Sequence, residues 1–166
     1  MKHTLEDLID QLNSDISWRK KEISDIKLLI DSSSSNKAII RCGIPLLYAH
    51  WEGFVKNSSE FFLNYVLKRK IPNNQLSLNL LTLSLRCSVD IEWNSNNHSH
   101  FGEITKFFQD RISDRSSIDY KKAINTKSNL TSSVLEEISW CLGIDYGVFE
   151  TKANFIDEIL LHRRNS

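Results

Sequence analysis

Glycine and proline are scarce in this chain, which has five Gly and two Pro among its 166 residues. Nucleotide-binding α/β folds hold phosphates in glycine-rich loops that follow a strand and open a helix. Neither the G-x-x-x-x-G-K-[ST] pattern nor the G-x-G-x-x-G pattern occurs in the sequence. The sequence therefore excludes P-loop and Rossmann enzymes.

Cysteine is also sparse, since Cys42, Cys87 and Cys141 are the three cysteines and lie more than forty residues apart. This spacing suits neither a disulfide framework nor a C-x-x-C zinc site, and small buried thiols indicate a reducing compartment. The longest unbroken apolar run, 44–49, is far shorter than the roughly 20 residues of a membrane span. Residues 1–7 lack a signal-peptide core, so we expect a soluble, cytoplasmic protein without a membrane segment.

An excess of charge of one sign is missing too. The chain has 21 Lys and Arg against 21 Asp and Glu, for a formal net charge of zero. No global basic field attracts nucleic acid to such a surface. Any nucleic-acid site must therefore be local.

The N-terminal part predicts one long amphipathic helix. Apolar side chains recur from Leu5 at alternating intervals of four and three residues, and Arg19 is the one break in this heptad-like stripe. Thr4 is a candidate N-cap, and the serine-rich stretch 32–36 ends the helix. The apolar members of the stripe are Leu5, Ile9, Leu12, Ile16, Ile23, Ile26 and Ile30.

Residues 37 to about 70 form the most apolar and aromatic part of the chain and predict its central, most buried helix. Asn36 is its candidate cap. Pro45 removes one backbone hydrogen bond in the first half of this helix, so we expect a kink over 43–45. The basic residues 68–70 and then Pro72 end it.

Shorter helices are expected in the rest of the chain. Residues 101–112 and 130–142 carry apolar side chains at helical spacing, and Gly143 ends the second of these helices. The last helix starts near Lys152. Its inward residues are predicted to be Phe155, Ile156, Ile159 and Leu160.

The segments between these helices are less regular. Residues 75–93 favour a short helix or an irregular segment, 94–100 a loop, and 113–128 an exposed polar stretch. Together the patterns predict one all-α domain over residues 1–166. It is a bundle of four to six helices packed around the two long N-terminal ones.

Two stretches of the sequence could carry chemistry. His50 and Glu52 lie within the most apolar helix, where charged groups are costly unless they are paired. Either both residues lie at the solvent edge or are satisfied by core neighbours, or Glu52 is held inside to orient an arginine from another helix. The second stretch is the ending 162–166, His-Arg-Arg-Asn-Ser, whose cations suit a helix C-terminus.

The order of residues in these stretches is more informative than their composition. Ala-His-Trp-Glu-Gly-Phe at 49–54 and Asp-x-x-Leu-x-x-Arg-Arg-Asn-Ser at 157–166 resemble the HEPN superfamily, particularly its bacterial HEPN-like nuclease branch. The resemblance covers most of the chain from Asn36 onward. The signature of this superfamily commonly reads Arg-Asn-x-x-x-His. Arg164 and Asn165 match its first two positions, and Glu52 matches the acidic residue that steadies the arginine.

This resemblance implies a metal-independent endoribonuclease of toxin or antiphage-defence type, with RNA as substrate and no cofactor. A histidine would act as general acid or base on the ribose 2′-hydroxyl, and Arg164 would stabilise the charge that develops on the phosphate. His50 and Arg163 are possible supporting residues. The resemblance also implies a homodimer with a shared cleft and a possible cognate antitoxin or defence partner.

The histidine of the signature is absent from these 166 residues, because it should fall at the third residue after Ser166. His162 precedes Arg164, and Arg41 lies nine residues before His50, so neither histidine has the usual spacing. We therefore expect a motif that is cut short and a chain that is inactive in this form. The alternative is a non-catalytic HEPN module that dimerises or binds RNA or protein.

Two further interpretations remain open from the residues alone. An unrelated all-α scaffold could end in Arg-Arg-Asn by accident. His98 and His100 could bind a metal ion, but Glu103 is the one carboxylate close to them, and exposed loop histidines are the commoner explanation.

Overall fold

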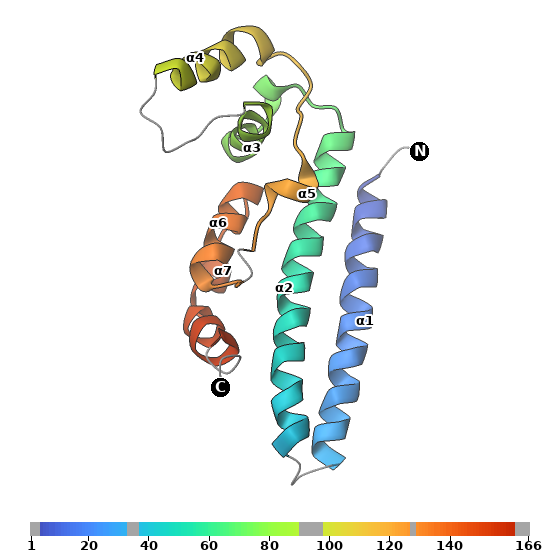
Figure 1. Cartoon of the computed structure of the whole chain (residues 1–166). Coiled ribbons are helices and arrows are strands. Elements are labelled where there is room, and N and C mark those ends of the chain that lie inside the picture. The colour runs from blue at the N-terminus through green and yellow to red at the C-terminus, as the bar shows by residue number, and fades with distance from the viewer. Residues whose placement is uncertain (1–3, 33–36, 90–97, 127–128, 162–166) are drawn as a thin grey trace.

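The computed structural model describes residues 4–32, 37–89, 98–126 and 129–161. It is all-α, as predicted, and two long N-terminal helices pack side by side, α1 (Leu5–Ser32) and α2 (Lys37–Lys68). Figure 1 shows them standing nearly parallel along most of their lengths. The described ranges contain seven α-helices, two of them only four residues long, and three 3₁₀ or π segments, so the predicted number of four to six helices was too low.

The start of α1 confirms the predicted cap. The Asp7 backbone N–H donates to Thr4 Oγ1 at 3.2 Å, and the Thr4 N–H donates to Asp7 Oδ2 at 2.7 Å. This reciprocal pair satisfies two backbone donors that the first helical turn leaves without partners. The predicted cap of α2, Asn36, lies outside the described residues.

Helix α2 continues unbroken through Pro45, and Figure 1 shows no sharp bend in its first half, so the predicted kink was wrong. Arg41, whose carbonyl loses its partner at Pro45, is exposed, and water can satisfy that group.

Gly43 lies where α2 approaches α1 closely. A Cβ at Gly43 would lie 3.3 Å from Ile30 Cδ1 and 3.5 Å from Ile26 Cγ2, so the missing side chain allows close approach.

The middle of the chain forms a group of short helical elements, several of which pack beside α2 or on the C-terminal part of the chain. It contains η1 (Asn73–Gln75), α3 (Leu78–Ser88), α4 (His98–Lys106), the π-helical η2 (Phe107–Arg111) and α5 (Tyr120–Ala123). Helix α3 confirms one of the two structures predicted for 75–93. The predicted loop over 94–100 was wrong at its end, because α4 already begins at His98.

The stretch 113–128 is not the exposed segment that its polarity suggested, since Ser116, Ile118 and Ile124 are buried. Backbone hydrogen bonds join it to the segment that follows α2, including Ser116 N–H to Ile71 O at 3.1 Å. The buried Asn73 amide donates to Arg111 O at 2.9 Å. Next to this pairing, Ile118 and Ile124 are buried in the core.

The C-terminal part packs on the other side of α2 from α1. It comprises α6 (Ser132–Leu142), α7 (Gly147–Glu150) and the π-helical η3 (Phe155–Leu161). Gly143 ends α6 with φ 71°, which confirms its predicted role as a left-handed C-cap. In η3, Ile156 is buried as predicted, but Phe155 is exposed because the neighbouring position faces away from the core. The side chains of Ile159 and Leu160 lie outside the description.

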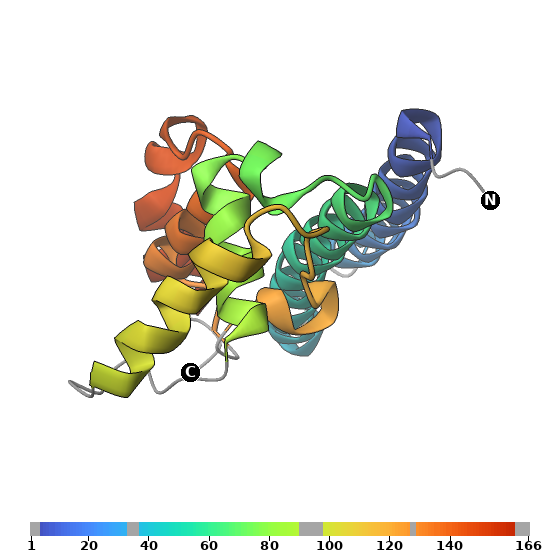
Figure 2. The ribbon, with the colours of Figure 1, turned by 90° about the horizontal axis from the view of Figure 1, so that it is seen from above.

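The main core lies between α2, α6 and the elements that follow them. Figures 1 and 2 both place α2 between α1 on one side and α6 with η3 on the other. Tyr48 and Leu63 of α2 meet Leu130 and Leu135 in this core, and Leu130 N–H donates to Tyr48 Oη at 2.5 Å. The first turns of α2 are exposed, so α2 is buried less uniformly than predicted. No helix in the described ranges is long and apolar enough to cross a membrane.

Candidate functional site

Glu52 lies in the middle of α2 and is half-buried. It follows Tyr48 by one helical turn, and helical periodicity places it on the same side of α2 as Ser59 and Leu63. That side faces the core shared with α6, and η3 also contacts α2. Within the described ranges no hydrogen bond or ion pair involves Glu52. The acidic residue of the predicted site is therefore on the side of α2 that meets the C-terminal part of the chain.

Residues 162–166, which hold Arg163, Arg164 and Asn165, lie outside the described residues. The pairing of Glu52 with Arg164 therefore stays a prediction. The described element nearest to these residues in sequence is η3, which ends at Leu161. π-Helical turns are rare and occur often at functional sites.

One carboxylate fixes η3 on the rest of the protein. Asp157 Oδ1 accepts a hydrogen bond from the Ser132 backbone N–H at 2.8 Å, and its Oδ2 accepts one from Ser132 Oγ at 2.5 Å. Ser132 opens α6, where free N–H groups and the helix dipole favour a negative charge. Asp157 thus sets the position from which the chain continues toward Arg164.

His50 does not share the environment of Glu52. The two residues are two positions apart on one helix and so point to different sides. The His50 side chain is 5% exposed and is buried against α1. Its ring packs edge-on to Trp18 with 5.3 Å between centroids, and its Nε2 lies 3.2 Å from Glu22 Oε2 without hydrogen-bonding geometry. The structure therefore separates the two candidates that the sequence placed together.

A buried ion pair occupies the α1–α2 interface beside His50. Asp15 and Arg19, both 7% exposed, form a two-pronged contact with Arg19 Nε to Asp15 Oδ2 at 2.7 Å and Nη2 to Oδ1 at 3.2 Å. The Asn57 amide donates to Asp15 Oδ1 at 2.8 Å, and Arg19 Nη1 donates to the His50 carbonyl at 3.1 Å. The guanidinium also lies 4.5 Å from the centre of the Trp18 ring. These contacts compensate much of the desolvation of both charges.

Two further features support this cluster. Burial raises the pKa of the Asp15 carboxyl, but hydrogen bonds from Arg19 and Asn57 together with the Arg19 charge outweigh it, so the pKa lies below its usual value. Gly53 gives the guanidinium its space, because a Cβ there would lie 2.8 Å from Arg19 Nη1. The cluster is structural in its contacts, and it fixes how α1 aligns with α2.

The sequence did not predict this cluster, although two residues in unexpected surroundings pointed to it. Arg19 is the single break in the α1 stripe, and His50 stands in the most apolar helix. A buried arginine needs a carboxylate, and Asp15 lies one turn earlier on the same helix. Asn57 and Gly53 could not be assigned without knowing how the two helices align.

Metal ligands do not gather in the described part of the chain. There, no group of three or more His, Cys, Asp and Glu side chains is placed to hold a metal ion. His98 and His100 are two positions apart on α4, so they point to different sides of that helix. Nothing in these ranges brings a third ligand to either histidine.

These features define one class of protein. It is an all-α bundle led by a long helical hairpin, with an acidic residue inside the second helix and an Arg-Asn ending. The chain belongs to the HEPN family, because the family model HEPN_MAE_28990 matches residues 8–166. This match rules out the interpretation that the chain is an unrelated all-α scaffold. Neither the curated proteins nor the solved structures contain a match.

Proposed function

We propose that this chain is the HEPN domain of a metal-independent endoribonuclease of toxin or antiphage-defence type. The observation that carries the proposal is Glu52, half-buried on the side of α2 that meets η3, in a HEPN chain whose ending supplies Arg164 and Asn165. Glu52 is the positioning residue, and Arg164 is the residue that contacts the RNA phosphate. A second copy of the chain completes a shared cleft.

The chemistry follows from what phosphoryl transfer to the ribose 2′-hydroxyl requires. A base removes the hydroxyl proton, an acid protonates the leaving 5′-oxygen, and a fixed cation stabilises the charge on the phosphate oxygens. Arg164 supplies that cation, and the carboxylate of Glu52 fixes its geometry. The acid–base group is a histidine, and these 166 residues do not hold one at the signature position. We therefore propose that they do not cleave RNA by themselves.

The test compares the 166-residue chain with one extended so that a histidine is the third residue after Ser166. With purified RNA and excess EDTA, the extended chain should cleave RNA and the shorter one should not. In the extended chain, Arg164→Ala should lower the rate by about 10² or more, as loss of a charge-stabilising donor does. Glu52→Gln should lower it less, because arginine stays in place with weaker support.

Matched controls separate these roles from general damage. Glu60 is another half-buried glutamate of α2, and Glu60→Gln should leave the rate unchanged. Arg86 is an exposed arginine of α3, and Arg86→Ala should do the same. An extended chain that folds and dimerises but leaves RNA intact would contradict the proposal.

A non-catalytic HEPN module that dimerises or binds RNA or protein, including an antitoxin or defence partner, is the second candidate. The incomplete signature and the zero net charge favour it. It predicts a dimer that retains RNA or a protein partner without cleavage even after the histidine is added. An extended chain that cleaves RNA would exclude it.

A further inference from the structure

An apolar hollow, the interhelical pocket, lies where α1, α2, α6 and α7 meet. It has a volume of about 250 Å³. Figure 2 shows α2 between α1 and the C-terminal helices, so the lining residues of α1 and α6 come from different sides of α2. Leu12 lines the pocket from α1, Phe54 and Phe62 from α2, Ile138 from α6 and Phe149 from α7. Residues from both halves of the chain thus enclose one space.

The polar groups of the pocket are few, and the hydroxyls of α2 already have partners. None of the described residues that line the pocket is charged, and its polar side chains are Ser58, Ser59 and Ser139. Ser58 Oγ donates to Phe54 O at 2.6 Å, and Ser59 Oγ donates to Val55 O at 2.6 Å. A charged ligand would lose its hydration here and meet no opposite charge, which is costly. The lining therefore selects an uncharged, apolar molecule.

The volume of the pocket limits the size of that molecule. A cavity of about 150 Å³ lined by leucine, isoleucine and phenylalanine takes up benzene, and drug-sized ligands fill about 300–1,000 Å³. The interhelical pocket, at about 250 Å³, lies between these cases. In proportion to benzene, it has room for about ten carbon atoms. Two fused aromatic rings or a compact cyclic hydrocarbon have this size.

Ile144 marks the entrance of the pocket. Its side chain lines the pocket, yet Ile144 is 49% exposed. It follows Gly143, whose φ of 71° ends α6, and it precedes α7. Helix α7 is only four residues long and lines the pocket through Phe149. A ligand can therefore enter at the link between α6 and α7 without unfolding the core around Leu63.

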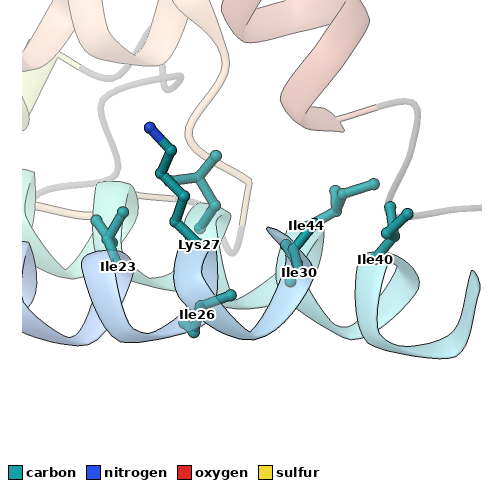
Figure 3. Close-up of a pocket in the computed structure, with 8 residues that line it drawn as sticks. Ile23, Ile26, Lys27, Ile30, Ile40 and Ile44 are labelled. Atoms are coloured by element: carbon teal, nitrogen blue, oxygen red, sulfur yellow. The ribbon is translucent and has the colours of Figure 1, made fainter. Parts of the chain in front are cut away.

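Another apolar hollow, the hairpin hollow, differs in its lining and in its charge. It has a volume of about 260 Å³ and lies between the second half of α1 and the first half of α2. Figure 3 shows Ile23, Ile40 and Ile44 around it, together with the side chain of Lys27. The Lys27 ammonium favours negative charge at this place. The hairpin hollow is therefore an internal comparison for a ligand without charge.

We propose that the interhelical pocket binds an uncharged apolar molecule of about ten carbon atoms with a fused-ring or cyclic skeleton. Binding removes apolar surface of both the ligand and the pocket from water, and this supplies the driving force. Because the bound molecule contacts α1, α2, α6 and α7 together, it holds the helical hairpin against the C-terminal part. The site uses neither Glu52 nor Arg164, so it is independent of RNA cleavage.

The experiment titrates naphthalene, an uncharged two-ring hydrocarbon, into the 166-residue chain and follows binding by calorimetry. We expect a dissociation constant of about 10–100 µM, in the range of efficient ligands of this size. Saturating naphthalene should raise the unfolding temperature by a few degrees, because it binds the folded state. Naphthalene-2-sulfonate has the same rings with one negative charge and should bind about tenfold more weakly or worse.

A pair of serine variants locates the site. Ser58→Leu fills the pocket from α2 and should abolish detectable naphthalene binding. Ser24 is the matched control, since its Oγ donates to Lys20 O at 2.8 Å in the same way, but it is exposed on α1 outside the pocket. Ser24→Leu should bind naphthalene as the wild type does. Circular dichroism establishes whether both variants are folded.

Methyl NMR of the wild-type chain locates the ligand without any substitution. Added naphthalene should shift the methyl signals of Ile138 and Leu142, which line the interhelical pocket. The signals of Ile40 and Ile44, which line the hairpin hollow, should stay in place.

Four outcomes would each overturn the proposal. They are no binding up to the solubility limit of naphthalene, equal binding of the sulfonate, unchanged binding by a folded Ser58→Leu chain, and NMR shifts at Ile40 and Ile44 instead. None of these measurements uses RNA, so a failure of ligand binding and a failure of RNA cleavage are separate results.

Discussion

Asp15 makes the stability of this domain depend on acid. Its carboxyl has a lowered pKa in the folded protein, so its contribution is complete above the unfolded value of about 3.9 and is lost as pH falls through the folded pKa. We expect Asp15→Asn to cost about 3 kcal/mol at neutral pH, because Arg19 keeps its buried charge without a carboxylate. The difference from wild type should stay constant from pH 8 to about pH 5 and shrink below about pH 4.

Urea unfolding at a series of pH values measures this difference. Asp25 is the control, since it lies on the same helix and is exposed. Asp25→Asn should change the unfolding free energy little at any of these pH values. A cost for Asp15→Asn that persists unchanged at pH 3 would contradict the assignment.

Gly53 should be the glycine that least tolerates a methyl group. Gly53→Ala places a Cβ 2.8 Å from Arg19 Nη1 and 3.1 Å from Nη2, and the ion pair and the His50 carbonyl restrict where the guanidinium can move. We expect destabilisation of about 1–3 kcal/mol, typical of overpacking. Gly102 on α4 has open space at the same position, so Gly102→Ala should stabilise the helix by about 0.5–1 kcal/mol. Thermal unfolding of the two variants should move in opposite directions.

At the scale of elements, the attachment of η3 depends on Asp157. Asp157→Ala removes both hydrogen bonds to Ser132 and the negative charge at the start of α6. The loss should be about 1–2 kcal/mol of unfolding free energy, as for a helix cap. Amide exchange should accelerate mainly across Phe155–Leu161. Glu158 is exposed, and Glu158→Ala should leave both measurements unchanged.

The elements that the sequence predicted well share one property, which is a clear local signal. Helix α1 has a cap and a regular stripe, and α6 has helical spacing followed by Gly143. The stretch 113–128 had no such signal, because Ile118 and Ile124 stand among polar residues and are buried by pairing with the distant segment after α2. Non-local backbone pairing of this kind produces no periodic spacing of apolar residues in the sequence.

The family was predictable from the sequence, but the arrangement of the residues around Glu52 and His50 was not. The family could be inferred from the residues around Glu52 and from Arg164 with Asn165, and the match over residues 8–166 agrees with that inference. The role of His50 could not be inferred, because which side of α2 meets α1 depends on Gly43, Gly53 and the Asp15–Arg19 pair together. The alignment of α1 with α2 depends on both helices together, so the sequence of either helix alone does not show it.

At the scale of the whole molecule, burial is uneven along the hairpin. The core around Leu63 and Leu135 is enclosed by α2, α6 and their neighbours, whereas the described residues 23–32 and 37–47 contact mainly each other. Amide exchange should therefore be faster over 23–32 and 37–47 than around Leu63. Equal protection of the two regions would contradict this uneven burial.

The Arg19 contacts also restrict how the length of the hairpin can change in evolution. A single residue inserted between Arg19 and Ile26 would turn Ile26 and Ile30 by about 100° away from Gly43. Two full turns, about seven residues, restore the same face, and α2 must then gain the same length before His50. Family members with longer or shorter hairpins should therefore differ from this chain by about seven residues in both helices at once.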